Sequence, residues 1–273
     1  MTVSPRLTLS MSILLANLVF VDRPAAAAAL GYDSVESWWP WQDDSATFDQ
    51  IDEFAQILTA NSLSLYLLNV TEGSERFGGR GLACIAEAGD EFWANTDSLL
   101  AVVAATQARY INVLAGNLDD ETQESAIETL VDRVSVLADR AAELGAGVVI
   151  EHLNPIDHPH YLLSDADLAV EVVSRVTAQS HSGNVGLLAD IYHLGRSGVD
   201  PVAFVAANAP VIHHVQLADA PGRGRPGSGA LPIRDVVAVL EAVGYTGRYG
   251  LEYLPVASEG IPSPAEFWRE LSL

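Results

Sequence analysis

Short apolar stretches alternate with longer amphipathic stretches along the chain. The short stretches are rich in Val, Ile and Leu, which is typical of strands buried on both faces, whereas the longer ones have the periodicity of helices. Eight strands are predicted, at Leu7 to Met11, Ser34 to Trp38, Ser62 to Leu68, Tyr110 to Leu114, Gly147 to Glu151, Gly186 to Asp190, Ile212 to Leu217 and Tyr249 to Glu252. This alternation predicts a parallel sheet covered by helices.

Helices are predicted between these strands. They cover Val19 to Leu30, Phe48 to Ala60, Glu91 to Thr106, Thr122 to Leu144, Asp165 to Val176 and Ile233 to Val243. Two of them stop at a glycine, Gly145 or Gly244, and glycine is a frequent C-terminal cap.

Polar residues at the strand ends help to distinguish a closed barrel from an open doubly wound sheet. Glu151, Asp190, Gln216 and Glu252 each fall at or near the end of a predicted strand. Barrel enzymes place their catalytic groups at this end, and barrels of about 250 residues are common. We therefore predict an α/β fold with a single (β/α)8 TIM barrel, in one domain over residues 1–273.

The N-terminal stretch imitates a secretory signal, because Arg6 precedes the apolar run Leu7 to Val21. Ser10 and Asn17 interrupt this run, which serves better as a buried strand followed by a helix. No run reaches the roughly 20 apolar residues of a membrane helix. The single cysteine, Cys84, excludes an intramolecular disulfide. We expect a cytoplasmic protein without a membrane segment.

The charge of the chain narrows the choice of partners and chemistry. The formal net charge is −22, which argues against nucleic acid and anionic membranes as partners. All 14 basic residues are arginine. The absence of lysine excludes Schiff-base aldolases and enzymes that hold pyridoxal phosphate as an aldimine. We expect no organic cofactor.

Two glutamates are the strongest catalytic candidates. Glu151 ends the apolar stretch VVIE, and Glu252 follows GL at the end of the last strand. Strands five and eight lie nearly opposite each other in an eight-stranded barrel, so the two carboxylates can flank a substrate and transfer protons. The alternative, a surface glutamate at a frayed strand end, fits the apolar flanks less well.

A further group of residues suits a divalent cation. Asp190 and His193 stand three apart in DIYH, and Gln216 lies in HHVQLAD. Together with Glu151 and Glu252, Asp190 and Gln216 offer three carboxylates and one amide, which suit Mg²⁺ or Mn²⁺ better than zinc. The open alternatives are a helix cap for Asp190, a buried hydrogen-bonded amide for Gln216 and a structural imidazole for His193.

Two glycine-rich segments, Val70 to Cys84 and Asp219 to Pro232, are predicted to cover the mouth of the barrel. Arg223 lies in the second segment and is suited to hold a substrate carboxylate. A surface arginine without such a role is the alternative.

Several stretches together resemble hydroxypyruvate isomerases, within the wider xylose-isomerase-like group. These are LSMSIL, GYDSVESWWPW, GGRGLACI, IEHLNPIDHPHYLL, DIYHLGRSG, HVQLADAPGRGRPGSG and LEYLP. The resemblance implies an enzyme that interconverts hydroxypyruvate and 2-hydroxy-3-oxopropanoate (tartronate semialdehyde). It thereby implies a place in glyoxylate metabolism. It implies Glu151 and Glu252 as the proton-transferring pair, with Asp190 and Gln216 completing the metal ligands.

The same resemblance implies His193, Arg223 and Asn69 as substrate-binding residues, and it leaves a homo-oligomer open. The chain departs from the family pattern at three positions. Leu68 stands where a histidine is usual, Leu254 where a lysine is usual, and Arg225 where an acidic residue is common. These departures concern substrate choice.

Other functions use a similar barrel. A 2-oxo-tetronate isomerase or a ketose 3-epimerase would use the same glutamates and cation on a longer substrate. Entry of Arg223 into the site is expected to favour a carboxylate substrate, because a neutral sugar would leave a buried guanidinium unpaired. A zinc nuclease fits poorly with the net charge of −22. A sugar-acid binding protein without catalysis is the non-enzyme alternative.

Overall fold

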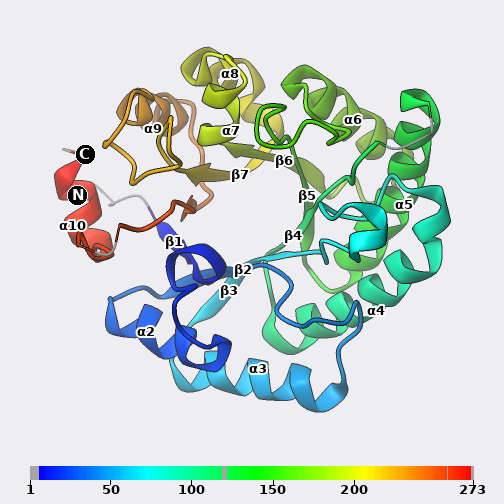
Figure 1. Ribbon diagram of the computed structural model, residues 1–273, viewed down its shortest axis with the longest axis horizontal. Helices are drawn as coiled ribbons and strands as arrows, with labels where there is room; N and C mark the ends of the chain where they lie inside the picture. The colour runs from blue at the N-terminus through cyan, green and yellow to red at the C-terminus, as the bar shows by residue number, and fades with distance from the viewer. Residues whose placement is uncertain (1–5, 119–121, 257, 272–273) are drawn as a thin grey trace.

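The computed structural model describes residues 6–118, 122–256 and 258–271. Its eight parallel strands close into a barrel in the order β1-β2-β3-β4-β5-β6-β7-β8, and each strand pairs with the next in the chain. Figure 1 looks into this barrel, with the helices in a ring around it. The predicted (β/α)8 fold is confirmed.

All eight predicted strands are present. They are β1 Leu7–Ser10, β2 Ser34–Ser37, β3 Ser64–Asn69, β4 Tyr110–Val113, β5 Gly147–Glu151, β6 Val185–Asp190, β7 Ile212–Leu217 and β8 Tyr249–Leu251. Several boundaries differ from the predicted ones by one or two residues, and two of these differences have local reasons. The first strand ends before Met11, which begins a short helix, and the third begins after Ser62, whose φ of 55° is not that of a strand.

The outer helices follow the predicted order. They are α1 Met11–Leu14, α2 Arg23–Ala29, α3 Phe48–Ala60, α4 Gly89–Thr106, α5 Gln123–Glu143, α6 Ala166–Gln179, α7 Ile191–Arg196, α8 Pro201–Asn208, α9 Ile233–Ala242 and α10 Pro264–Glu270. The predicted helix from Val19 to Leu30 is wrong in its first part, where a 3₁₀ turn, Phe20–Asp22, precedes α2. Pro24 lies in the first turn of α2, where its missing N–H costs nothing.

The interior of the barrel is layered along the strands. An apolar layer consists of Leu67, Tyr110, Val149 and Leu188, one from each of β3 to β6. Side chains of a strand alternate between its two faces, so the residue two positions further along faces the interior again. Those residues are Asn69, Asn112, Glu151 and Asp190, and all four are buried. The polar layer therefore lies directly above the apolar one, at the carboxyl ends of the strands.

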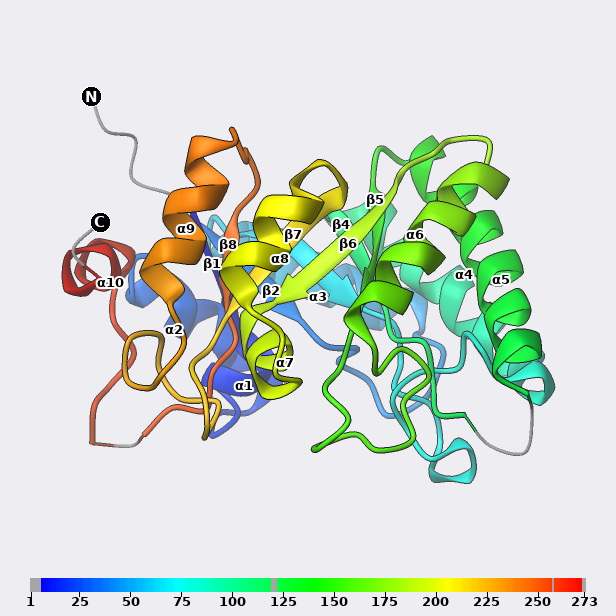
Figure 2. The same ribbon diagram turned by 90° about the horizontal axis from the view of Figure 1, so that it is seen from above.

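Long connections gather on the carboxyl-terminal side of the barrel, along the lower edge of Figure 2. They include the two glycine-rich segments, 70–84 and 219–232. The first is tied to the barrel by hydrogen bonds from Val70 N to Asn112 O and from Cys84 N to Ala115 O. None of the helices in the described part of the chain is long and apolar enough to cross a membrane.

Gly81 anchors the first segment, and its replacement by alanine is expected to destabilise the fold. Its φ is +100°, and a Cβ would lie 2.1 Å from the carbonyl oxygen of Leu114. Gly79→Ala is the matched control, because its φ is +70° but nothing lies within 4 Å of a Cβ. Urea unfolding should show a loss of about 1 kcal/mol for Gly79→Ala, from backbone strain alone. Gly81→Ala should lose about 2 kcal/mol more from the added clash; equal losses would contradict the clash.

Candidate active site

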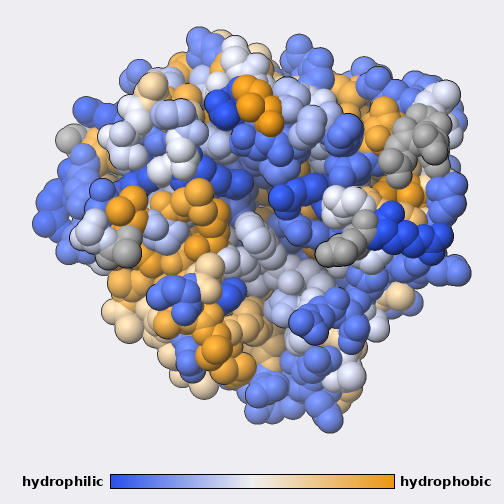
Figure 3. Space-filling view, in the orientation of Figure 1, coloured by the Kyte–Doolittle hydropathy of each residue, from blue (hydrophilic) through white to orange (hydrophobic). Residues whose placement is uncertain are grey.

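A pocket opens at the carboxyl ends of the strands, where Figure 3 shows a hollow walled largely by hydrophilic side chains. Its volume of about 90 Å³ has room for several water-sized groups. The lining consists of Trp38, Asn69, Glu72, Arg80, Leu114, Glu151, Leu153, His158, His193, Arg223 and Glu252. The structure thus brings together all the residues predicted to be catalytic or substrate-binding.

Glu151 ends β5 and is 4% exposed. Its Oε2 accepts a hydrogen bond of 2.7 Å from Nδ2 of Asn112, and the same amide group lies 3.3 Å from Oδ1 of Asn69. Burial raises the pKa of Glu151 well above its ordinary value, and the nearby Glu252 raises it further. Its direct partner is a neutral amide, so the metal-free site favours the protonated form.

Glu252 follows β8 and has a charged partner. Its Oε2 accepts a hydrogen bond of 2.7 Å from Nη2 of Arg223, and its Oε1 accepts one of 2.8 Å from Nε1 of Trp38. Burial raises the pKa of Glu252 to about 7, against the opposing effect of Arg223. The two glutamates are therefore in unlike surroundings, and Glu252 ionises more readily than Glu151.

Asp190 ends β6 and contacts both the N-terminus of α7 and the guanidinium of Arg223. Its Oδ1 caps α7 by accepting hydrogen bonds from the backbone N–H groups of Tyr192 and His193. Its Oδ2 lies 3.1 Å from Nη2 of Arg223. The helix cap is thus real, and it leaves the second oxygen directed toward Arg223. The guanidinium of Arg223 bridges Asp190 and Glu252.

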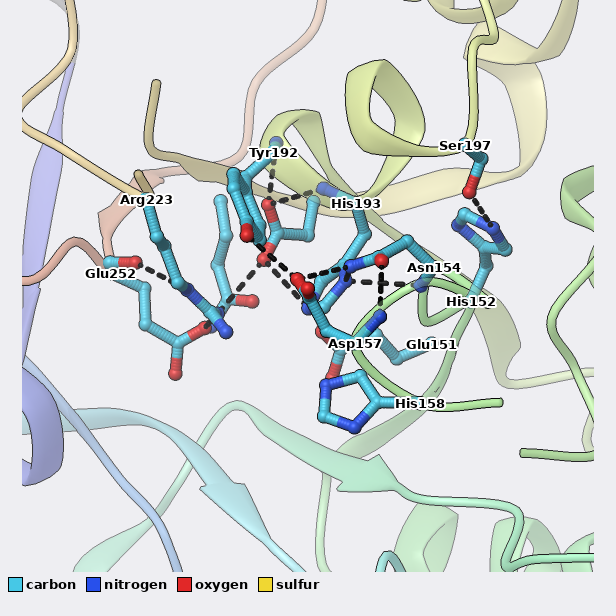
Figure 4. Close-up of polar contacts among 12 residues, drawn as sticks. Glu151, His152, Asn154, Asp157, His158, Tyr192, His193, Ser197, Arg223 and Glu252 are labelled. Carbon is cyan, nitrogen blue, oxygen red and sulfur yellow. Dashed lines mark hydrogen bonds and ion pairs between the residues drawn. The ribbon is translucent and has the colours of Figure 1, made fainter. Parts of the chain in front are cut away.

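His193 is 1% exposed and its tautomer is fixed by its neighbours. The backbone N–H of Asn154 donates to Nδ1 at 3.1 Å, and Nδ2 of Asn154 lies 2.7 Å from the same nitrogen (Figure 4). Burial lowers the pKa of His193 well below its ordinary value, so the ring is neutral. A neutral ring that accepts at Nδ1 carries its proton on Nε2, which lies 3.6 Å from Oδ2 of Asp190.

Two sets of residues are candidates to hold a cation. Ligand atoms of Glu151, Asp190 and His193 lie within 4.8 Å of one another. The fixed tautomer argues against His193 in this set, since a nitrogen that carries a proton cannot bind a metal. Gln216 fits better, because its Oε1 is buried and has no hydrogen-bond partner among the described residues. In register, Gln216 pairs with Asp190.

Contrary to the expectation from the sequence, the position of Arg223 does not distinguish a carboxylate substrate from a neutral sugar. Its guanidinium does enter the pocket, but Asp190 and Glu252 already neutralise it, and Nε donates to the carbonyl of Glu252. A neutral sugar would therefore leave no unpaired buried charge. The premise that a neutral sugar would leave this guanidinium unpaired is wrong, so the entry of Arg223 does not by itself favour a carboxylate substrate.

Sequence reasoning missed a second arginine in the pocket, Arg80. Its Nε donates to Nδ1 of His158 at 3.2 Å, and its Nη1 pairs with the half-exposed Glu72. Burial lowers the pKa of His158 to about 4, so this ring is neutral. The only signal in the sequence was the position of Arg80 within the glycine-rich segment 70–84.

Sequence reasoning also missed Glu36, which is 1% exposed on β2. Its carboxylate accepts hydrogen bonds from His214 and Gln216 on β7. A charged residue within a predicted strand was the available signal, because a barrel strand is buried on both faces.

Comparisons with known proteins agree with this architecture. A family described as xylose isomerase-like TIM barrel matches residues 24–271. A putative hydroxypyruvate isomerase of Streptomyces coelicolor is 38% identical over 92% of this chain and 91% of its own length. The hydroxypyruvate isomerase of Escherichia coli is 29% identical over 92% of this chain and 93% of its own. The 2-oxo-tetronate isomerase of Cupriavidus necator is also 29% identical, over 93% and 94%.

A solved structure is similar as well. The structure of an AP endonuclease, family 2, from Brucella melitensis superimposes with a TM-score of 0.85 at 28% identity. The match covers 97% of this chain and 98% of the other. The similarity therefore extends over the whole barrel and not over a shared fragment.

The buried carboxylates predict an unusual pH dependence of stability for the metal-free protein. The pKa of Glu252 is raised in the folded state from 4.5 to about 7, so the folded protein binds more protons than the unfolded chain in this window. The free energy of unfolding must then fall as pH rises. Calorimetry should show a Tm that drops by about 5 °C across this range. Glu151→Gln should lessen the drop, and a Tm that rises instead would contradict the burial argument.

Proposed function

The chain belongs to the xylose isomerase-like TIM barrel family, and on that premise we propose that it is a hydroxypyruvate isomerase. The reaction interconverts hydroxypyruvate and 2-hydroxy-3-oxopropanoate. The observation that carries the proposal is the pair Glu151 and Glu252, two buried carboxylates of unlike proton affinity in one small pocket. Such a pair suits an acid and a base that act on neighbouring carbons.

The proton transfers follow from the two environments. Glu252, which ionises more readily, removes a proton from the hydroxymethyl carbon of hydroxypyruvate. The electrons move toward the carbonyl, which gives an enediolate. Glu151, which holds its proton more firmly, delivers a proton to the former carbonyl carbon, while the oxygens exchange one proton between them. Nε2–H of His193 is suited to donate a hydrogen bond to a substrate oxygen during these steps.

We assign a divalent cation, Mg²⁺ or Mn²⁺, to this site. The candidate ligands are Glu151, Asp190, Gln216 and Glu252, whose oxygen atoms are those that such cations prefer. When bound, the cation supplies positive charge that stabilises the enediolate. Support comes from the unpaired Oε1 of Gln216 and from the close carboxylates of Glu151 and Asp190.

The carboxylate of the substrate is best received by Arg80 and His158. Arg223 is neutralised by two buried carboxylates, whereas Arg80 faces the half-exposed Glu72 and a neutral imidazole. Because Nδ1 of His158 accepts a hydrogen bond, its proton lies on Nε2, which makes it a second donor. Asn69 lines the same pocket and is assigned to a substrate hydroxyl.

A second candidate function is the isomerisation of a four-carbon 2-oxo acid. The relative from Cupriavidus necator that is named 2-oxo-tetronate isomerase favours it. A ketose 3-epimerase is less favoured, because Arg80 suits a carboxylate. A nuclease is disfavoured by the net charge of −22. We further propose a cytoplasmic protein that acts as one barrel domain, in keeping with its single cysteine.

The test of the chemistry is solvent-deuterium exchange into hydroxypyruvate, followed by NMR. Metal-stripped protein restored with Mg²⁺ or Mn²⁺ should place deuterium on the hydroxymethyl carbon and form the aldehyde. Glu151→Gln should lower the rate about 10²- to 10⁴-fold, since an amide cannot carry the proton. Glu128→Gln, an exposed residue on α5, is the control for the change of charge and should keep full turnover. Full turnover of Glu151→Gln would refute the mechanism.

Arg80→Met should weaken binding more than it slows the chemical step. Loss of a charge-assisted contact is expected to raise KM for hydroxypyruvate about 10- to 100-fold, with a smaller change in kcat. Arg76→Met is the matched control, because Arg76 lies on the same segment, is exposed and does not line the pocket. Steady-state kinetics of both variants decide the matter. An unchanged KM in Arg80→Met would assign the carboxylate to another residue.

A further inference from the structure

Glu36 projects into the barrel from β2 and joins two residues of β7. Its Oε1 lies 2.7 Å from Nε2 of His214, and its Oε2 accepts a hydrogen bond of 2.8 Å from Nε2 of Gln216. The side chains of Glu36 and His214 are 2% and 0% exposed, so solvent does not compete for these contacts. Both oxygens of the carboxylate are thereby occupied.

The carboxylate decides how the amide of Gln216 is turned. The NH₂ group of Gln216 donates to this carboxylate, so the nitrogen side of the amide faces Glu36. Oε1 of Gln216 must then point away from Glu36. This oxygen is buried and has no partner among the described residues, an arrangement that is unfavourable unless a ligand completes it.

The neighbouring strand leaves room for this arrangement. Gly250 lies beside Gln216 in the register of β7 and β8. A Cβ at this position would lie 2.2 Å from Oε1 of Glu36 and 3.0 Å from Cγ of Gln216. On the other side, Gln216 pairs in register with Asp190 on β6. Gln216 is thus flanked in register by Gly250 on one side and by Asp190, a candidate metal ligand, on the other.

We propose that Glu36 is a positioning residue, which locks the amide of Gln216 with its oxygen toward the cation. His214 holds the other oxygen of the carboxylate and keeps it in place. This inference rests on the proposed metal-assisted function and concerns the same site. It assigns a role to a buried acid that is not among the residues lining the pocket.

A double-mutant cycle between Glu36 and Gln216 tests the proposal. In Glu36→Gln, the new amide has a donor as well as an acceptor, so Gln216 can be held in either orientation. Mn²⁺ binding to the metal-stripped protein, measured from free Mn²⁺ by electron paramagnetic resonance, should weaken about 10-fold. Gln216→Leu removes the ligand altogether. The double variant should then bind Mn²⁺ within about two-fold of Gln216→Leu alone.

Thermal unfolding of each metal-free variant separates positioning from folding. Glu36→Asp keeps the charge but shortens the reach, so it should weaken Mn²⁺ binding in the same way and provides a second variant if Glu36→Gln folds poorly. A Glu36 variant that loses Tm but binds Mn²⁺ as tightly as the unaltered protein would overturn the proposal. So would a loss of affinity that persists at full size in the Gln216→Leu background.

The outcomes also separate this inference from the proposed function. If the unaltered protein binds Mn²⁺ and isomerises hydroxypyruvate but Glu36→Gln binds equally well, only the positioning role fails. If the unaltered protein binds no Mn²⁺, the positioning role and the assigned cation fail together, and deuterium exchange without metal then judges the isomerase activity independently.

Discussion

The burial of four carboxylates at one end of the barrel is the constraint on which the rest of the site depends. Glu36, Glu151, Asp190 and Glu252 are each between 1% and 4% exposed. Ionised carboxylates in so dry a place repel one another and lose their hydration, which is costly unless donors or cations compensate. Most of the polar contacts at the mouth can be understood as compensation for this cost.

The compensation is distributed unevenly, and that unevenness produces the chemistry. Glu36 contacts the imidazole of His214 and the amide of Gln216 on β7, whereas Glu151 receives one amide. A single guanidinium, that of Arg223, serves both Asp190 and Glu252. The single positive charge of Arg223 cannot neutralise all four carboxylates, so further positive charge would stabilise the site. A divalent cation and a proton held by Glu151 each lessen this need for positive charge.

The fold and most of the pocket were predictable because they follow from patterns along single strands. The apolar run before Glu151 predicted both the strand and the burial of the carboxylate at its end. The partners of these residues were not predictable, because they depend on register between strands and on loop conformation. The contact from Glu36 to Gln216 joins residues 180 positions apart, and no local pattern encodes it. Arg80 reaches the pocket through a segment without regular periodicity.

The three departures from the family pattern lie outside the pocket. Leu68 alternates with the inward-facing Leu67 and Asn69, and it packs in the core between barrel and helices. Leu254 is 53% exposed, and Arg225 pairs with Glu270. None of the three lines the pocket in the described structure. Selection among 2-oxo acids must therefore act through the lining residues. Among these, Arg80 pairs with the half-exposed Glu72 and donates to the neutral imidazole of His158, whereas Arg223 is neutralised by buried carboxylates.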